Sequence, residues 1–311
     1  MLPNLFVVGA DRGAIGLLRA QLARHPEIFV PRAGDPNYFT FAGGVPEFAR
    51  PDLGRAGWRT RRALRRELHA DAVTGADAYL RLYRGAGARP VRADLSSAHL
   101  DSLAAAARIR GCVPEARIVA ILRQPVDRAL GRFAAMRQAG LEPLASLVEA
   151  LAVEPHRQLQ GWAPGWLYAR GGYYHRQLEP YVRFFGRERV HVMLVEDLVR
   201  QPELVMPALC SFVGVAPPEL ARVAVALDPV TGRAQTWLGR LTGALLGHRV
   251  AVADRSSVTA RAILAERYAP DIARLEALLG QHLSAWAAPA PLDRLRATGP
   301  VLDAPALALA A

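Results

Sequence analysis

The placement of arginine is the clearest chemical feature of this sequence. Arg12 follows the apolar run Leu5–Ala10 and opens a glycine-containing segment, and Arg123 ends a second apolar run that begins at Arg117. Guanidinium groups bind phosphate and sulfate through paired, charge-assisted hydrogen bonds. A loop between a strand and a helix also directs backbone N–H groups and the positive end of the helix dipole at an anion. The pattern therefore predicts anion binding at Arg12 and Arg123.

The composition excludes several other chemistries. All 39 basic residues are arginine, because the sequence contains no lysine, and the net charge is +11. Without lysine, a Schiff base or the phosphate-loop lysine of a nucleotide kinase is impossible. Abundant Ala and Gly indicate coding bias, so the charge alone does not predict nucleic-acid binding, and no reading motif supports it. Cys112 and Cys210 lie 98 positions apart and indicate neither a metal site nor a disulfide framework.

Strands and helices that must position these residues alternate along the chain. Apolar runs predict strands at Leu5–Ala10, Val91–Leu95, Arg117–Arg123 and Val190–Val195. Helical spacing predicts helices at about 17–25, 60–70, 98–111, 126–139, 142–153, 174–185 and 202–213, and at 260–286 with a break at Pro270. This alternation predicts an α/β fold, with a central parallel sheet flanked by helices.

The domain organisation follows from where this pattern ends. We expect one α/β domain over residues 1–286 and a flexible Ala/Pro-rich tail over 287–311. No apolar run is long enough to cross a bilayer, and no leader with a cleavage site is visible, so we expect a cytoplasmic protein without a membrane span.

Six segments in this order resemble the PAPS-dependent sulfotransferases, especially their carbohydrate-type and bacterial branch. The segments are Val7–Leu18 with His25–Ile28, Pro36–Phe39, Asp94–Leu100, Arg117–Arg132, Glu196–Leu198 and Tyr268–Trp286. The resemblance covers most of the chain and implies a P-loop-like sulfotransferase fold. It also implies transfer of a sulfuryl group from PAPS (3′-phosphoadenosine 5′-phosphosulfate, which leaves as PAP) to a hydroxyl or amine. The acceptor would be a small molecule, a glycan or a natural product, and no metal is required.

The resemblance assigns the loop after the first strand to the phosphosulfate. Arg12 stands at the family's loop lysine and would stabilise the leaving oxygen, and Gly13, Ala14, Ile15 and Gly16 would complete the binding loop. Ala14 replaces the usual glycine, and Ile15 and Gly16 replace two threonines, so two hydroxyl donors are lost. We expect the branched Ile15 side chain to lie where the phosphosulfate would bind. A tight turn with a solvated Arg12 is the alternative.

The same resemblance assigns Arg123 to the 3′-phosphate of the donor. Gly131 occupies the position of a family serine, so a further hydroxyl is missing there. The structural alternative is an ion pair that holds Arg123 at the end of its strand. For Arg128 we favour the structural role, with a pair to Asp127 or Glu115.

Two residues are candidates for removing the proton of the acceptor, which sulfuryl transfer requires. Asp35 stands where the carbohydrate-type enzymes have a glutamate base, although an aspartate before a proline is also an ordinary turn residue. His99 stands at a family tyrosine and is the histidine best placed to titrate near a substrate, although a lone histidine is more often structural. Leu95 replaces a second active-site lysine beside Asp94 and Ser96.

A second function remains open at this point. Seven substitutions at chemical positions beside a preserved scaffold also fit a homologue that has lost PAPS chemistry and acts as a binding protein or catalyses another reaction. The arginines of a predicted helix would form a solvated face, or else contact an anionic acceptor; they are Arg59, Arg61, Arg62, Arg65 and Arg66.

Overall fold

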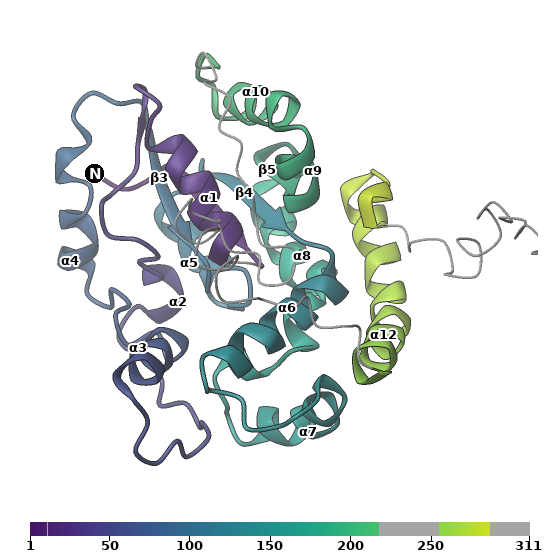
Figure 1. Ribbon diagram of the computed structural model, residues 1–311. Helices are drawn as coiled ribbons and strands as arrows, with labels where there is room; N and C mark the ends of the chain where they lie inside the picture. Colours follow the sequence, from purple (N-terminus) through teal and green to yellow (C-terminus); the bar gives the residue numbers. More distant parts are fainter. Residues whose placement is uncertain (11, 218–254, 287–311) are drawn as a thin grey trace, which may run out of the picture.

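A five-stranded parallel sheet forms the centre of the molecule, as a computed structural model describes it for residues 1–10, 12–217 and 255–286 (Figure 1). The strand order is β2-β3-β1-β4-β5. The bounds are Leu5–Gly9 for β1, Ile28–Phe29 for β2, Val91–Ser96 for β3, Arg117–Leu122 for β4 and Val190–Leu194 for β5. The predicted α/β fold is confirmed, and the four predicted strands end within one residue of these bounds. The two-residue edge strand β2 is too short to give a periodic signal.

Side chains of the central strands alternate between two apolar cores. Phe6, Val8, Ile118 and Ala120 face one side of the sheet, where α5 (Ala105–Cys112) and α8 (Tyr174–Phe185) cover them. Leu5, Val7, Val119 and Ile121 face the other side, beneath α1 (Arg12–Leu22) and α10 (Pro202–Val213). All eight side chains are at most 1% exposed. Burial on both faces explains why these strands are apolar at every position.

The chain connections place a crevice at the carboxyl edge of β1 and β4. From β1 the chain passes through α1 toward β2 and β3, whereas from β4 it passes through α6 (Pro125–Gln138) toward β5. Ligands of parallel sheets bind where such connections diverge. The remaining helices are α2 (Tyr38–Phe41), α3 (Trp58–Glu67), α4 (Ala76–Arg81), α7 (Leu147–Leu159), α9 (Val195–Arg200) and α12 (Arg255–Leu279). Of these, α7 and α12 pack with α6 around a third apolar core beside the sheet (Figure 1).

Several helices differ from the sequence prediction: α1 begins at Arg12 rather than near 17, α2 and α4 were not predicted, and three others have different bounds or no break. Helix α5 begins only at Ala105, and the preceding residues form turns. Ser102 Oγ accepts a hydrogen bond from the Ala105 N–H at 3.2 Å. In α7 the start is at Leu147, because Ser146 Oγ accepts from the N–H of Glu149 at 3.2 Å. The last, α12, continues through Pro270 without the expected break. Buried side chains on both sides of this proline, such as Tyr268 and Leu275, hold the helix against its neighbours.

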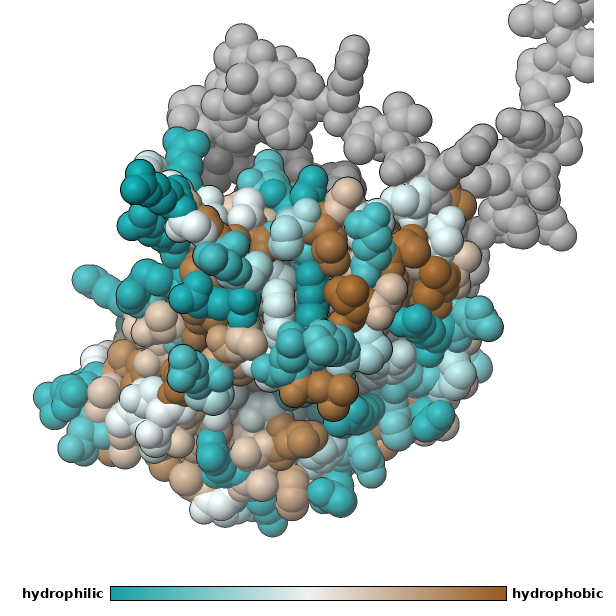
Figure 2. All heavy atoms as spheres, turned by 90° about the horizontal axis from the view of Figure 1, so that it is seen from below, coloured by the Kyte–Doolittle hydropathy of each residue, from teal (hydrophilic) through white to brown (hydrophobic). Residues whose placement is uncertain are grey.

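The surface of the described residues mixes polar and apolar side chains. On the face shown in Figure 2, hydrophobic residues form small groups between hydrophilic ones. None of the helices in the described part of the chain is long and apolar enough to span a bilayer. The tail predicted over 287–311 lies outside the described residues.

Candidate active site

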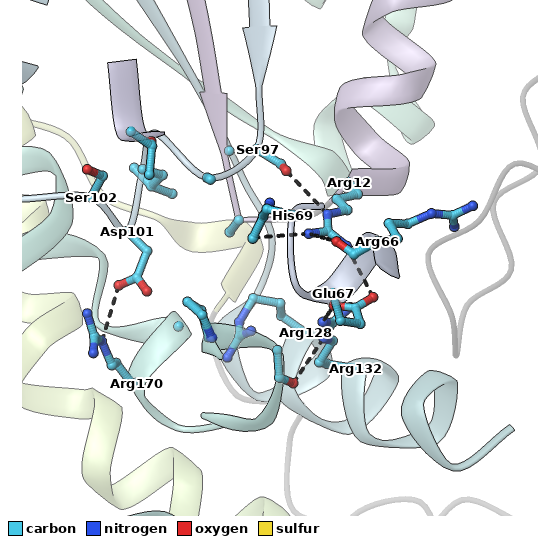
Figure 3. A pocket seen from close by; sticks show the side chains of 18 of the residues that line it. Arg12, Arg66, Glu67, His69, Ser97, Asp101, Ser102, Arg128, Arg132 and Arg170 are labelled. Atoms are coloured by element: carbon cyan, nitrogen blue, oxygen red, sulfur yellow. Dashed lines mark hydrogen bonds and ion pairs between the residues drawn. The ribbon is translucent and has the colours of Figure 1, made fainter. Parts of the chain in front are cut away.

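A cavity of about 440 Å³ opens at the carboxyl edge of the sheet. Its walls come from the end of β1, the start of α1, the turns after β3, the last turn of α3, the middle of α6 and the segment 164–171. Figure 3 shows Arg12, Arg66, Glu67 and Arg132 on one side of this cavity, and Asp101 and Arg170 on the other. We refer to it as the main pocket.

Gly9 fixes the loop at one end of the main pocket. A methyl group on Gly9 would lie 2.5 Å from Ile121 Cγ2 and 3.0 Å from the Ile121 carbonyl oxygen. The N–H of Ala10 donates to that same carbonyl at 3.1 Å. Only glycine therefore lets β1 approach β4 this closely. Helix α1 begins three residues later, at Arg12.

Arg12 is held by polar partners from three other segments. Its Nη1 donates to Glu67 Oε1 at 3.1 Å and its Nε donates to Ser97 Oγ at 3.3 Å. Asp35 Oδ2 lies 3.7 Å from the same Nε. The Arg12 side chain is 27% exposed, so its guanidinium is paired rather than fully solvated, and it faces the main pocket at the start of α1.

Glu67 joins two arginines at the pocket wall. Arg132 donates to both carboxylate oxygens of Glu67, with 3.3 Å from Nη1 to Oε1. Burial alone would raise the pKa of the Glu67 carboxyl, but Arg132 and Arg12 outweigh it and lower the pKa to about 2. Glu67 is therefore a permanent counter-ion that holds both guanidinium groups in place, and it is unsuited to accept a proton.

His69 completes the contacts of Arg12. It is buried and adopts a positive φ of 52°, and its Nε2 lies 3.4 Å from Arg12 Nη2. Burial and the neighbouring Arg12 lower the pKa of His69 to about 4, while Asp35 and Glu67 act in the opposite direction. The imidazole is neutral at pH 7, so its Nε2 can accept from the guanidinium.

We expect His69 to reduce the stability of the fold as the pH falls from 6.5 to about 4. Because its pKa is lower in the folded state, the unfolded chain takes up the proton first, and the free energy of unfolding falls with falling pH across this window. The full effect is on the order of 3 kcal/mol. Urea unfolding at about pH 7 and about pH 4 measures it. In His69→Asn, which tolerates the positive φ and does not titrate, this part of the pH dependence should vanish. An unchanged pH dependence would contradict the assignment.

Asp35 stands behind Ser97 and beside Arg12. Its Oδ1 accepts from the Ser97 N–H at 2.6 Å, and its Oδ2 accepts from Ser97 Oγ at 2.8 Å. Asp35 lines a second cavity, of about 420 Å³, whereas Arg12, Ser97, Arg66 and His69 line both cavities. The predicted base therefore reaches the main pocket through the Ser97 hydroxyl.

His99 lines neither cavity. It is fully buried, its Nδ1 pairs with Thr40 Oγ1 at 2.8 Å, and its carbonyl oxygen accepts from the Tyr181 hydroxyl at 2.8 Å. This second acid–base candidate therefore lies behind the wall of the main pocket, which Thr40 lines. Ser96 is also buried, where its hydroxyl donates to Asp94.

The obstruction of the loop by Ile15 stays a prediction. Ala14 and Ile15 are 1% and 5% exposed and pack in the core between α1 and the sheet. Ile15 also lines the second cavity, so its side chain borders both the core and this space. Gly13 lines the main pocket, and Gly16 lines the second cavity, where an added side chain would meet no atom within 4 Å.

The two residues of the second predicted anion site, Arg123 and Gly131, lie in different surroundings. Arg123 is buried at the end of β4, where its carbonyl accepts from the Tyr174 hydroxyl at 2.8 Å. It lines neither of the two cavities defined by the described residues, whereas Gly131 lines the main pocket from α6. Arg123 and Gly131 therefore do not converge on one wall of that pocket.

The expected ion pair of Arg128 with Asp127 or Glu115 is wrong. Asp127 pairs with Arg261 at 2.8 Å, and Glu115 pairs with Arg189. Arg128 instead turns inward from α6, is 8% exposed, and lines the main pocket.

The arginines of α3 play different parts. Arg62 and Arg66 line the second cavity, and Arg66 also reaches the main pocket. The other three are turned elsewhere: Arg59 stacks on Trp58, Arg61 donates to the Ala56 carbonyl, and Arg65 pairs with Asp71. Contact of Arg62 and Arg66 with an anionic acceptor stays a prediction, which their position on the cavity walls supports.

The charges of the main pocket suit an anionic ligand. Five arginines and two carboxylates line it; they are Arg12, Arg66, Arg128, Arg132, Arg170, Glu67 and Asp101. Burial raises the pKa of Asp101, although Arg170 at 3.4 Å opposes this. Among the described residues, no group of three His, Cys, Asp or Glu side chains is placed to hold a metal ion.

Comparisons with known proteins agree with this geometry. A model described as the sulfotransferase family matches residues 3–219. The crystal structure of a sulfotransferase from Alicyclobacillus acidocaldarius is 28% identical, with 93% of this chain and 100% of that chain covered and a TM-score of 0.71. A sulfotransferase domain from the olefin synthase of Synechococcus is 20% identical, with 85% and 94% covered and a TM-score of 0.48. A mouse sulfotransferase complexed with PAP is 10% identical, with 87% and 84% covered and a TM-score of 0.47. No curated protein sequence matches.

Proposed function

The chain belongs to the sulfotransferase family, and on this premise we propose that it transfers a sulfuryl group from PAPS to a hydroxyl or amine of a small acceptor. The observation that carries the proposal is the meeting of Arg12, Ser97 and Asp35 at the mouth of the loop after β1. A cation lies beside a hydroxyl that is hydrogen-bonded to a carboxylate. These are the groups needed to stabilise a leaving phosphate and to remove a proton from an acceptor.

The residues of the loop fit the phosphosulfate end of PAPS. Gly9, Ala10, Arg12 and Gly13 line one end of the main pocket, and α1 directs its positive end toward them. The two threonine hydroxyls that the resemblance implies are missing here. Each would form a hydrogen bond that contributes about 0.5–1.5 kcal/mol to the binding of the donor. We therefore expect donor affinity roughly 5- to 100-fold weaker than a complete loop would give.

The sulfuryl transfer needs one proton acceptor and one charge stabiliser. PAPS supplies the sulfuryl group; a bond forms between the acceptor oxygen or nitrogen and sulfur, and the bond from sulfur to the bridging oxygen breaks. The acceptor proton passes to Asp35 through Ser97 Oγ, which donates to Asp35 Oδ2 at 2.8 Å. Arg12 stabilises the charge that develops on the leaving oxygen, and Glu67 and His69 keep its guanidinium in position.

Binding of PAP tests the donor assignment. We expect calorimetry to show tighter binding of PAP than of adenosine 5′-phosphate, which lacks the 3′-phosphate. The proposal places the 3′-phosphate at the end of β4, beside the main pocket rather than inside it, because Arg123 lines neither cavity. In Arg123→Ala this preference should fall roughly 10- to 100-fold, because a charge-assisted hydrogen bond to phosphate contributes about 1.5–3 kcal/mol. Arg117→Ala, at the exposed opposite end of β4, is the control and should leave the preference unchanged.

Two outcomes would argue against this reading. Equal losses for both nucleotides would remove Arg123 from the 3′-phosphate site. No binding of PAP at all would favour the alternative function, in which the fold has lost PAPS chemistry and uses the cleft for another ligand or reaction.

A further inference from the structure

We propose that the acceptor carries an oxyanion, such as a carboxylate, and that Arg128 binds it inside the main pocket. The proposal rests on the proposed function, because it names the class of acceptor for that same site. It depends on two buried polar atoms, Arg128 Nε and Gln177 Oε1, that have no hydrogen-bond partner among the described residues.

Arg128 is a buried cation that faces the main pocket, and no carboxylate of the described residues forms an ion pair with it. Its side chain donates to the Tyr168 carbonyl and lies beside the Tyr268 hydroxyl, which are both neutral groups. Its Nε has no hydrogen-bond partner in the described part of the chain. Burial of a charged group is unfavourable unless an opposite charge and hydrogen bonds compensate. An oxyanion in the pocket would supply both.

Neighbouring carboxylates are committed to other groups. Asp101 pairs with Arg170 at 3.4 Å. The two oxygens of Glu154 accept from the N–H groups of Ala169 and Arg170, each at 2.8 Å. Arg128 lowers the pKa of both carboxyl groups from a distance, but neither forms an ion pair with it. An oxyanion of the ligand would be the first to contact this guanidinium directly.

Three other arginines of the main pocket have a carboxylate partner, which Arg128 lacks among the described residues. Arg12 and Arg132 share the carboxylate of Glu67, and Arg170 has Asp101. Figure 3 shows Arg128 between these two paired groups. The position is therefore distinct from the loop end of the pocket, where Arg12 would meet the phosphosulfate.

Gly171 leaves the space that the Arg128 guanidinium occupies. A methyl group on Gly171 would lie 2.8 Å from Arg128 Nη1. Any larger residue at position 171 would push the guanidinium out of its place. The cation is thus seated in a shaped recess rather than on an open surface.

Gln177 presents a buried acceptor atom, so a ligand in the main pocket should carry a hydrogen-bond donor. It is 8% exposed and lines the main pocket from α8, and its Oε1 has no partner among the described residues. Its Nε2 donates to the Arg170 carbonyl at 3.4 Å, which directs Oε1 away from that segment. An acceptor with an oxyanion and a hydroxyl or amine would satisfy both Arg128 and Gln177.

Two phenols of equal size test the proposal: 4-hydroxybenzoate, with a carboxylate, and 4-hydroxybenzyl alcohol, without one. With PAP present, calorimetry on wild-type protein should show at least about tenfold tighter binding of 4-hydroxybenzoate. In Arg128→Met the preference should be lost while PAP affinity stays the same, and Arg128→Lys should retain part of it. Arg183→Gln, at an exposed position on α8, is the matched control and should behave as wild type.

Several results would overturn the proposal. These are equal binding of the two phenols to the wild type, or loss of PAP affinity rather than of the carboxylate preference in Arg128→Met. Binding of inorganic sulfate as tight as that of 4-hydroxybenzoate would also overturn it, because the site would then hold a free anion. If Arg128→Met does not fold, Gln177→Glu replaces it; its new carboxylate should pair with Arg128 and abolish the preference. Failure of PAP to bind, with the carboxylate preference intact, would contradict the proposed function but not this subsite.

Discussion

Arg12→Gln is expected to lower kcat for sulfuryl transfer by about 10²- to 10³-fold, the range for loss of one group that stabilises developing charge. Glutamine removes the cation at the start of α1 but leaves Glu67 paired with Arg132, so the pocket wall should stay in place. The measurement is the rate of sulfated product formed from PAPS and an acceptor that the protein binds. Arg12→Lys should retain most of the activity, because lysine is the residue that the family resemblance implies at this position.

Arg24→Gln serves as the control, since this arginine is exposed just beyond the other end of α1. It should leave kcat unchanged. A kcat for Arg12→Gln within about threefold of wild type would show that the guanidinium does not act on the leaving oxygen.

Asp35→Asn is expected to lower kcat by about 10²-fold or more, as for the loss of a general base. The change is isosteric, and asparagine tolerates the positive φ of 57°. Its amide oxygen can still accept from the Ser97 N–H, so the segment should keep its conformation. Donor affinity should change little, because the carboxylate acts on the acceptor. Turnover and PAP calorimetry on the same variant separate these two effects.

Two further variants define the proton path. Ser97→Ala should reduce kcat as well, because Ser97 Oγ links Asp35 to the main pocket. Asp71→Asn, at an exposed ion pair with Arg65, should have no effect. If Asp35→Asn is nearly normal and Asp101→Asn is not, then Asp101, whose pKa burial raises, is the base instead.

The central sheet was predictable because β1 and β4 are apolar on both faces and its strands are separated by segments with helical spacing. Helix starts were less predictable. The start of α7 depends on a single side chain, because Ser146 Oγ accepts from the Glu149 N–H, and α5 begins after a turn in which Ser102 Oγ accepts from the Ala105 N–H. The apolar residues just before these caps continue the pattern of the helix, so periodicity alone places its start too early.

Residues of the site were predictable only where they directly follow a strand in the sequence. Arg12 lies one short loop beyond β1, so its position followed from the order of elements. Glu67 and Arg132 were missed, because their pairing joins α3 to α6 across 65 positions of sequence and leaves no local pattern. The orientation of Ile15 depends on the exact residue at which α1 begins, which an ungapped comparison of loops does not give.

The partition between the two cavities is built from side chains rather than from backbone. Arg12, Arg66, His69 and Ser97 line both spaces, and Arg12 is fixed by Glu67, Ser97 and His69. The two spaces are therefore separate chambers that share one wall. Groups that bind on opposite sides of this wall would border the same guanidinium without meeting each other.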